Sequence, residues 1–162
     1  VQKALKGVNM FESSKPLSVN SHETVLEIVL DGLKPNKAME TLQWFFNEKQ
    51  IPFPQVLKAQ PMPKTETTNE GTLFLFTGPL EFMRAIEKEL PTAPVKTFVR
   101  RFSTVTMTCT GVTSPQLHDQ LMKSLEKNQI QFSELLVSGM SITIIVPQDA
   151  RDKAVQTLHS LM

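Results

Sequence analysis

The side chains that most often carry out chemistry in proteins are few in this chain and lie far apart. The three histidines, His22, His118 and His159, fall in different elements, and none has metal-ligand spacing to another His, Cys or acidic residue. The single cysteine, Cys109, lies among threonines, which favours a structural thiol over a nucleophile. Neither a Walker-type phosphate loop nor a Gly-x-Gly-x-x-Gly motif is present. We therefore expect no catalytic residue and no metal site in this chain, which would not be catalytic by itself.

Composition and charge exclude further classes of function. The 162 residues include 40% hydrophobic and 20% charged ones, an ordinary balance for a globular protein. Lys and Arg number 17 against 16 Asp and Glu, so the net charge of +1 offers no electrostatic surface for nucleic acid or anionic membranes. No apolar run approaches the roughly 20 residues that span a bilayer. A single cysteine fits the reducing cytoplasm, and a chain that begins with Val1 suggests a part of something longer.

The apolar residues that would position a site follow an internal repeat. An offset of 79 residues (111 − 32) places Leu42 on Leu121, Gln50-Ile51 on Gln129-Ile130 and Phe53 on Phe132. Farther along the offset falls to 69 (154 − 85), and residues 60–70, with their Pro and Thr residues and Lys64, absorb the difference as a loop insertion.

Each repeat predicts the order strand, helix, strand, strand, helix. For the first repeat we expect strands over residues 25–30, 53–59, 72–77 and 95–100, one helix capped by Asn36 and a second that begins with Pro79. For the second repeat we expect strands over 104–110, 130–137 and 140–146, and helices over 115–127 and 149–161 with Ser114 as a cap.

The second repeat ends on a helix and leaves no residues for a fourth strand. An unclosed sheet edge would expose unpaired backbone groups, so we predict that a strand from residues 5–19 completes this unit. The fold class is then α+β: two ferredoxin-like βαββαβ units in tandem, with antiparallel sheets, helices on one face, and the first unit inserted in the second. The predicted boundaries are 22–101 for the first unit and 1–21 plus 102–162 for the second.

Two further features bear on partners. Residues 72–77 are apolar on both faces, which predicts that another sheet or subunit covers the second face, or that packing within the chain does so. Trp44 lies off the apolar stripe of its helix, and it would contact a partner or stand as a partly buried boundary residue.

The order of several segments carries a resemblance to a known family. A glycine loop, a helix, a β-rich run and a final helix occupy residues 111–115, 122–125, 138–146 and 152–159 of the second repeat. Lys34-Pro35 and Glu70-Gly71-Thr72 lie at similar places in the first. This order and the nesting of the units resemble the ACT domain family, tandem copies of which form the regulatory part of aspartokinases.

The resemblance implies a regulatory domain of an aspartokinase, an ATP-dependent enzyme of lysine, threonine and methionine biosynthesis. Such a domain senses an amino-acid effector, mediates subunit association, or both. The family's loop before the first helix offers backbone N–H groups to the effector's carboxylate. Carried onto this sequence, the effector-binding residues are Lys34, Pro35, Asn36, Lys37 and Ala38, with Gly71 and Thr72 nearby.

The implied partners are lysine or threonine as effector, a kinase domain or catalytic subunit, and a second copy of the chain in a homodimer. ATP and Mg²⁺ are expected only in a kinase domain outside this chain, and no cofactor, nucleic acid or membrane is expected here. One alternative is a degenerate unit that serves only dimerisation, since Pro52-Phe53-Pro54 replaces the family's polar Asn-Ile-Asp. RNA binding is a second alternative, because the RRM fold shares this topology. An acylphosphatase-type enzyme is a third, although residues 31–37 lack the arginine it would need.

Overall fold

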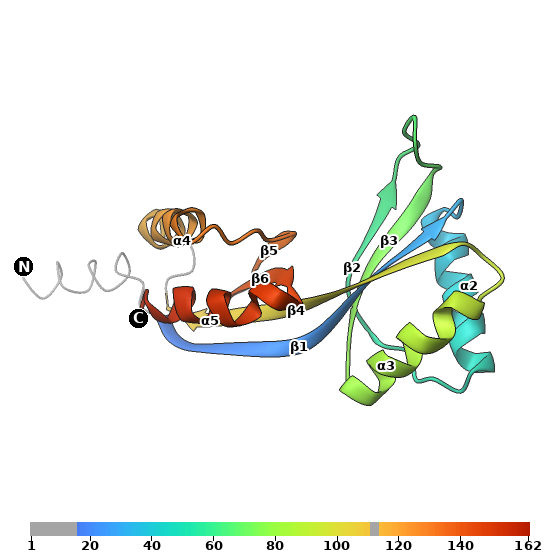
Figure 1. Ribbon diagram of the computed structural model, residues 1–162, viewed down its shortest axis with the longest axis horizontal. Helices are drawn as coiled ribbons and strands as arrows, with labels where there is room; N and C mark the ends of the chain where they lie inside the picture. The colour runs from blue at the N-terminus through green and yellow to red at the C-terminus, as the bar shows by residue number, and fades with distance from the viewer. Residues whose placement is uncertain (1–15, 111–113) are drawn as a thin grey trace, which may run out of the picture. The chain divides into compact units, whose positions relative to one another are not determined.

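The computed structural model describes residues 16–110 and 114–162, which form two compact units. One unit is Thr24–Phe102, and the other contains, among the described residues, 16–23 and 103–162. The elements in chain order are β1 (Pro16–Asp31), α2 (Pro35–Glu48), β2 (Gln55–Met62), β3 (Gly71–Thr77), α3 (Leu80–Glu89), η1 (Leu90–Thr92), β4 (Thr97–Cys109), α4 (Pro115–Lys127), β5 (Glu134–Val137), β6 (Ser141–Pro147), η2 (Gln148–Ala150) and α5 (Arg151–His159) (Figure 1).

The strands follow the hydrogen-bonded order β2-β3-β1-β4-β6-β5. β1 and β4 each contribute residues to both units, because the unit boundaries fall inside these two strands. The first unit therefore uses the order β2-β3-β1-β4, and the second uses the corresponding order β5-β6-β4-β1. Antiparallel registers join β1 to β3, β2 to β3 and β5 to β6. The predicted fold class, two ferredoxin-like βαββαβ units of which the first is inserted in the second, is confirmed.

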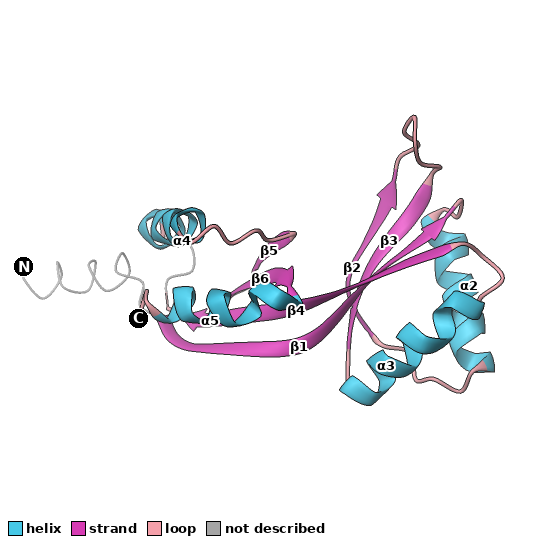
Figure 2. Cartoon of the chain, in the orientation of Figure 1, coloured by secondary structure: helices cyan, strands magenta, loops and turns pink. Residues whose placement is uncertain are grey.

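The core of the first unit lies between its strands and the helices α2 and α3 (Figure 2). Side chains alternate along a strand, so one face of β1 and β3 supplies the core. The fully buried members include Leu26, Ile28, Leu30, Phe74 and Phe76 from these strands, Leu42 and Phe46 from α2, and Met83 and Ile86 from α3. The apolar side chains of the two helices, spaced three and four residues apart, face this core.

The second unit buries the corresponding faces of β4 and β6 against α4 and α5. Leu117, Leu121 and Leu125, which are four residues apart in the sequence, form the apolar stripe of α4, and each is at most 2% exposed. Of the segment predicted to complete this sheet, residues 5–15 lie outside the described residues. Residues 16–19 belong to β1, and Val19 packs against this second core.

Two strands are longer than the sequence pattern indicated. The runs 95–100 and 104–110, predicted as separate strands, belong for all but residues 95, 96 and 110 to the single strand β4. The run 25–30 is likewise part of the 16-residue strand β1. Polar residues 20–24 precede the run in β1, and Arg101 and Ser103 flank Phe102 between the two runs of β4, but backbone ladder hydrogen bonds do not require apolar side chains. A loss of apolar alternation therefore did not end either strand.

Several element ends also differ from the prediction. Lys34, not Asn36, is the N-cap of α2, because Pro35 lacks an N–H and suits the first helical position. α3 begins at Leu80, with Pro79 one residue earlier as its N-cap. β5 is restricted to Glu134–Val137, and the last helix is divided into η2 and α5.

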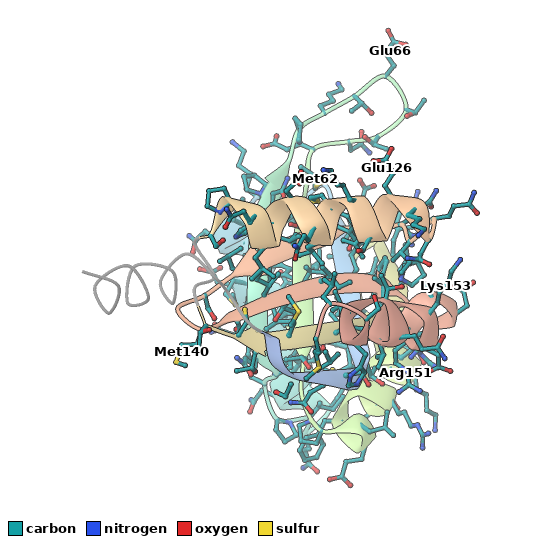
Figure 3. All side chains as sticks on the ribbon, turned by 90° about the vertical axis from the view of Figure 1, so that its left-hand side faces the viewer. Met62, Glu66, Glu126, Met140, Arg151 and Lys153 are labelled. Carbon is teal, nitrogen blue, oxygen red and sulfur yellow. The ribbon has the colours of Figure 1, made fainter. Side chains whose placement is uncertain are left out.

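The insertion that distinguishes the two repeats is the loop between β2 and β3. It covers residues 63–70, since β2 continues to Met62, and Glu66 lies at its tip (Figure 3). Beyond this loop Phe74 and Phe76 of β3 face the helices, and on the opposite face Leu75 is 1% exposed within the single chain while Leu73 and Thr77 are half-buried. Leu75 is thus covered without a second subunit. No helix in the described part of the chain is both long and apolar enough to cross a membrane.

Candidate functional site

The loop that joins β1 to α2 ends in a helix N-terminus without a side-chain cap. Lys34 occupies the N-cap position with extended backbone angles, and its side chain accepts no hydrogen bond from the helix. The first turn of α2 carries no acidic residue. The first N–H groups of a helix have no partner within the helix and lie at the positive end of its dipole. This end of α2 is therefore suited to accept a carboxylate or another anion.

The seven predicted effector-binding residues divide into two groups. The side chains of Lys34, Pro35, Asn36 and Lys37 are exposed around the start of α2. Ala38 is fully buried and packs into the core of the first unit, and Gly71 and Thr72 are buried as well. Only the first group has side chains accessible to a ligand, and the second group supports the loop.

Thr72 supports the loop through a hydrogen bond. Its hydroxyl donates to the carbonyl oxygen of Leu33 at 2.8 Å, and its side chain is 0% exposed. Beside this contact, the backbone N–H of Gly32 donates a hydrogen bond to the carbonyl oxygen of Glu70 at 2.6 Å. The start of β3 thereby holds the loop that precedes α2.

Gly71 is required by the same close approach of backbones. A Cβ atom at this position would lie 2.7 Å from the carbonyl oxygen of Leu30 on the neighbouring strand. Gly71 faces Asp31 in the β1–β3 register, so the two strands meet tightly beside the loop. Its observed role is therefore close packing of two strands.

Two residues of this loop, Asp31 and Gly32, are absent from the predicted binding set. Gly32 adopts a φ of +81°, a conformation in which glycine is favoured, and it turns the chain from β1 into the loop. Asp31, half-buried at the end of β1, places its carboxylate 3.5 Å from the amide nitrogen of Asn69. The dipeptide Asp31-Gly32 is a common turn signal and could have indicated both residues.

The corresponding helix of the second unit differs at its start. The hydroxyl of Ser114, the predicted cap of α4, accepts a hydrogen bond from the backbone N–H of Leu117 at 3.5 Å. Its helix therefore has its own side-chain acceptor, whereas α2 has none. Residues 111–113 lie outside the described part of the chain.

The residues considered for other chemistry stand apart from this loop. Cys109 is fully buried, and its burial raises the pKa of the thiol. His118 and His159 lie on α4 and at the end of α5. Among the described residues, no group of three or more His, Cys, Asp or Glu side chains could hold a metal ion. The aromatic side chains of β3 face the core of the first unit, so they cannot stack on bases as an RNA-binding sheet requires.

Comparison with solved structures relates the fold to one group of proteins. The ligand-free regulatory subunit of aspartate kinase from Thermus thermophilus has a TM-score of 0.62 and 16% identity, over 91% of this chain and 99% of that one. The regulatory subunit from Thermus flavus gives 0.59 and 16%, over 91% and 98%. Aspartokinase III of E. coli, in complex with lysine and aspartate in the T-state, gives 0.56 and 13%, over 92% of this chain and 34% of that one.

No protein-family model matches the chain, and a search of the curated proteins found no match. The structural likeness extends over nearly the whole chain and over nearly the whole length of the two Thermus regulatory subunits. The chain thus has the fold of the regulatory domains of aspartate kinases.

Proposed function

We propose that this chain is the regulatory part of an aspartokinase and that it senses a free amino acid, lysine or threonine, at the start of α2. The observation that carries the proposal is the uncapped N-terminus of α2 within a fold that resembles aspartate kinase regulatory subunits. Lysine occurs with aspartate in the similar T-state structure of aspartokinase III, which supports an amino-acid effector.

The proposed binding mode follows from the charges around the loop. The effector's carboxylate accepts hydrogen bonds from the first N–H groups of α2, and the exposed ammonium groups of Lys34 and Lys37 add favourable charge. The effector's ammonium group needs an acceptor, and the Asp31 carboxylate at the other end of the loop supplies one. Gly71 and Thr72 act indirectly, because they hold the backbone of the loop in place.

Regulation requires that the effector bind two states of the protein unequally. A ligand shifts a conformational equilibrium only through its differential affinity for the two states. The partner in this proposal is a kinase domain or catalytic subunit in the cytoplasm, and ATP and Mg²⁺ bind to that partner.

An assembly role without an effector is the second candidate function. β2 stands at one end of the strand order, and edge strands present backbone groups that can pair with another chain. Phe53 and Val56, just before and within β2, are 40% and 37% exposed. This combination favours a homodimer that pairs along β2.

Thermal unfolding in millimolar lysine, threonine or methionine tests the sensing role. A ligand that binds only the native state raises the midpoint temperature of unfolding. At a ligand concentration one hundred times its Kd, the free energy of unfolding increases by about 2.7 kcal/mol. Lys34→Asp places a carboxylate at the N-cap of α2, where it would compete with the effector's carboxylate, so we expect the shift to disappear. Lys64→Asp makes the same change of charge in the exposed loop 63–70 and serves as the control.

Two outcomes separate the candidate functions. A midpoint that no amino acid raises would exclude sensing and leave the assembly role. Sedimentation equilibrium tests that role: a dimer that Val56→Lys converts to a monomer supports pairing along β2, and a monomeric parent chain would contradict it.

A further inference from the structure

A surface pocket lies at the opposite end of α2 from the loop. Its volume is about 230 Å³, and it is lined by Trp44, Phe45, Glu48 and Lys49 together with residues 92–94. All of these residues belong to the first unit. α2 has 14 residues and rises 1.5 Å per residue, so the pocket lies roughly 20 Å from the uncapped N-terminus. It is therefore a separate place from the proposed effector loop.

The positive charge of the pocket is held in a defined position. The Lys49 ammonium lies 3.6 Å from the Glu89 carboxylate and 5.8 Å from the centroid of the Phe45 ring. An ammonium group has three donors, so one contact with Glu89 leaves others for a ligand. Lys49 is 41% exposed at its side chain, and a ligand carboxylate can reach it from the pocket.

The negative charge comes from the neighbouring residue. Glu48 is exposed, and none of the ion pairs found among the described residues includes its carboxylate. The negative end of the α2 dipole lies at the same place, since Glu48 is the last residue of the helix. Both effects favour a ligand ammonium group beside Glu48.

Apolar surface completes the pocket between these two charges. The Trp44 side chain is 54% exposed, and Ala93 and Pro94 lie across from α2. Thr92 donates its hydroxyl hydrogen to the carbonyl of Glu89 at 2.6 Å, which leaves the hydroxyl oxygen able to accept a hydrogen bond. The pocket thus offers a donor, an acceptor and an apolar wall over a short span.

We propose that this pocket binds a small zwitterion, namely a free α-amino acid. Its carboxylate lies against Lys49, its ammonium group against Glu48, and its side chain against the indole of Trp44. The pocket is smaller than the roughly 300–1,000 Å³ of sites for drug-sized ligands, and its size suits a molecule as small as an amino acid. The site is independent of the effector loop, and it does not require that the loop bind anything.

The fluorescence of Trp44 can report binding at this site. Trp44 is the only tryptophan, and the sequence has no tyrosine, so the intrinsic fluorescence excited at long wavelength comes from the pocket itself. Titration with lysine and with methionine is expected to give a saturable change in Trp44 emission. Cadaverine, which has no carboxylate, and hexanoate, which has no ammonium group, are expected to give none at the same concentrations.

Variants on α2 separate this pocket from a general effect of charge. Glu48→Gln and Lys49→Gln are each expected to weaken the apparent affinity at least tenfold. Glu40→Gln on the same helix and Lys64→Gln in the loop 63–70 each remove one exposed charge outside the pocket, and they are expected to leave the affinity unchanged. Circular dichroism confirms that each variant is folded before the titration.

Three results would overturn the proposal. The first is the absence of any saturable emission change with either amino acid. The second is an equal response to cadaverine or hexanoate, which would indicate binding by one charge alone. The third is a response that survives Glu48→Gln and Lys49→Gln but is lost in Lys34→Asp, which would place the only binding event at the start of α2. Conversely, a response that persists in Lys34→Asp supports the pocket even if the proposed effector loop binds nothing.

Discussion

Gln50 and Gln129 adopt the same left-handed backbone conformation, with φ angles of 57° and 55°, at equivalent positions of the two units. Each follows a helix C-terminus, and each is succeeded by an isoleucine whose N–H donates to a carbonyl five residues earlier at 2.9 Å. The positions differ by 79 residues (129 − 50), the offset of the repeat in the sequence. The two units therefore share the detailed way in which their first helices end, and not only their order of elements.

Glycine at either of these positions is expected to stabilise the protein. A non-glycine residue in this conformation is strained, and glycine is the residue that most often ends a helix in this way. Gln50→Gly and Gln129→Gly should each raise the free energy of unfolding by about 0.5–1 kcal/mol, measured by urea denaturation. The control is Gln43→Gly in the exposed interior of α2, which should lower it by about 1 kcal/mol. A loss of stability in both helix-end variants would contradict the argument.

Substitution of Gly71 is expected to be costly although alanine is small. The new Cβ would lie 2.7 Å from the carbonyl oxygen of Leu30, a backbone atom that cannot move without shifting β1. We expect Gly71→Ala to lower the free energy of unfolding by about 1–3 kcal/mol. Gly139→Ala is the matched control, because a Cβ there meets nothing within 4 Å, and its effect should stay within about 0.5 kcal/mol. Equal effects of the two substitutions would show that the close approach of Leu30 to Gly71 does not cause the loss of stability.

The order of elements could be predicted from the sequence because two signals agreed. The apolar residues of the helices, such as Leu117, Leu121 and Leu125, have the spacing of one helical face. The repeat also predicted the same order of strands and helices in both halves of the chain. The continuity of β1 and β4 could not be predicted in this way. Residues 20–24 of β1 are polar, and in β4 polar side chains flank Phe102, so the apolar pattern is broken although backbone pairing continues.

The exposed part of the candidate site was easier to predict than its support. Lys34 and Asn36 stand in a loop whose sequence resembles a family motif, and both are exposed beside the helix start. That Thr72 would use its hydroxyl to hold Leu33 depends on two segments 39 residues apart, and no local pattern encodes such a contact. The pocket beside Trp44 likewise forms from α2 and residues 92–94, which only the tertiary structure brings together.

The difference between the two helix starts can be measured directly. Ser114→Ala removes the side-chain acceptor for the Leu117 N–H and should lower the free energy of unfolding by about 0.5–1 kcal/mol. Lys34→Ala removes no cap hydrogen bond and should change it by less than about 0.5 kcal/mol. Lys34→Ser should raise it, because a serine there can accept from an N–H group that lacks a side-chain partner. A decrease in the free energy of unfolding for Lys34→Ala as large as that for Ser114→Ala would contradict the uncapped start of α2.

The stability of the second unit is expected to fall at alkaline pH because of Cys109. Burial raises the pKa of this thiol above the value of about 8.5 that a cysteine has in an unfolded chain. Below that pH both states hold the proton, so the contribution to stability is fully present. As the pH rises further, the unfolded chain releases its proton first, and the free energy of unfolding falls by up to about 1.4 kcal/mol per pH unit until the folded pKa is reached. Urea denaturation at pH 7.5 and at pH 9.5 should therefore show a larger decrease in the free energy of unfolding for the parent chain than for Cys109→Ala. The cavity in Cys109→Ala lowers this free energy equally at both pH values. Identical decreases in the two proteins would mean that the buried thiol does not contribute, and rapid modification of the native thiol by a disulfide reagent at pH 8 would contradict its burial.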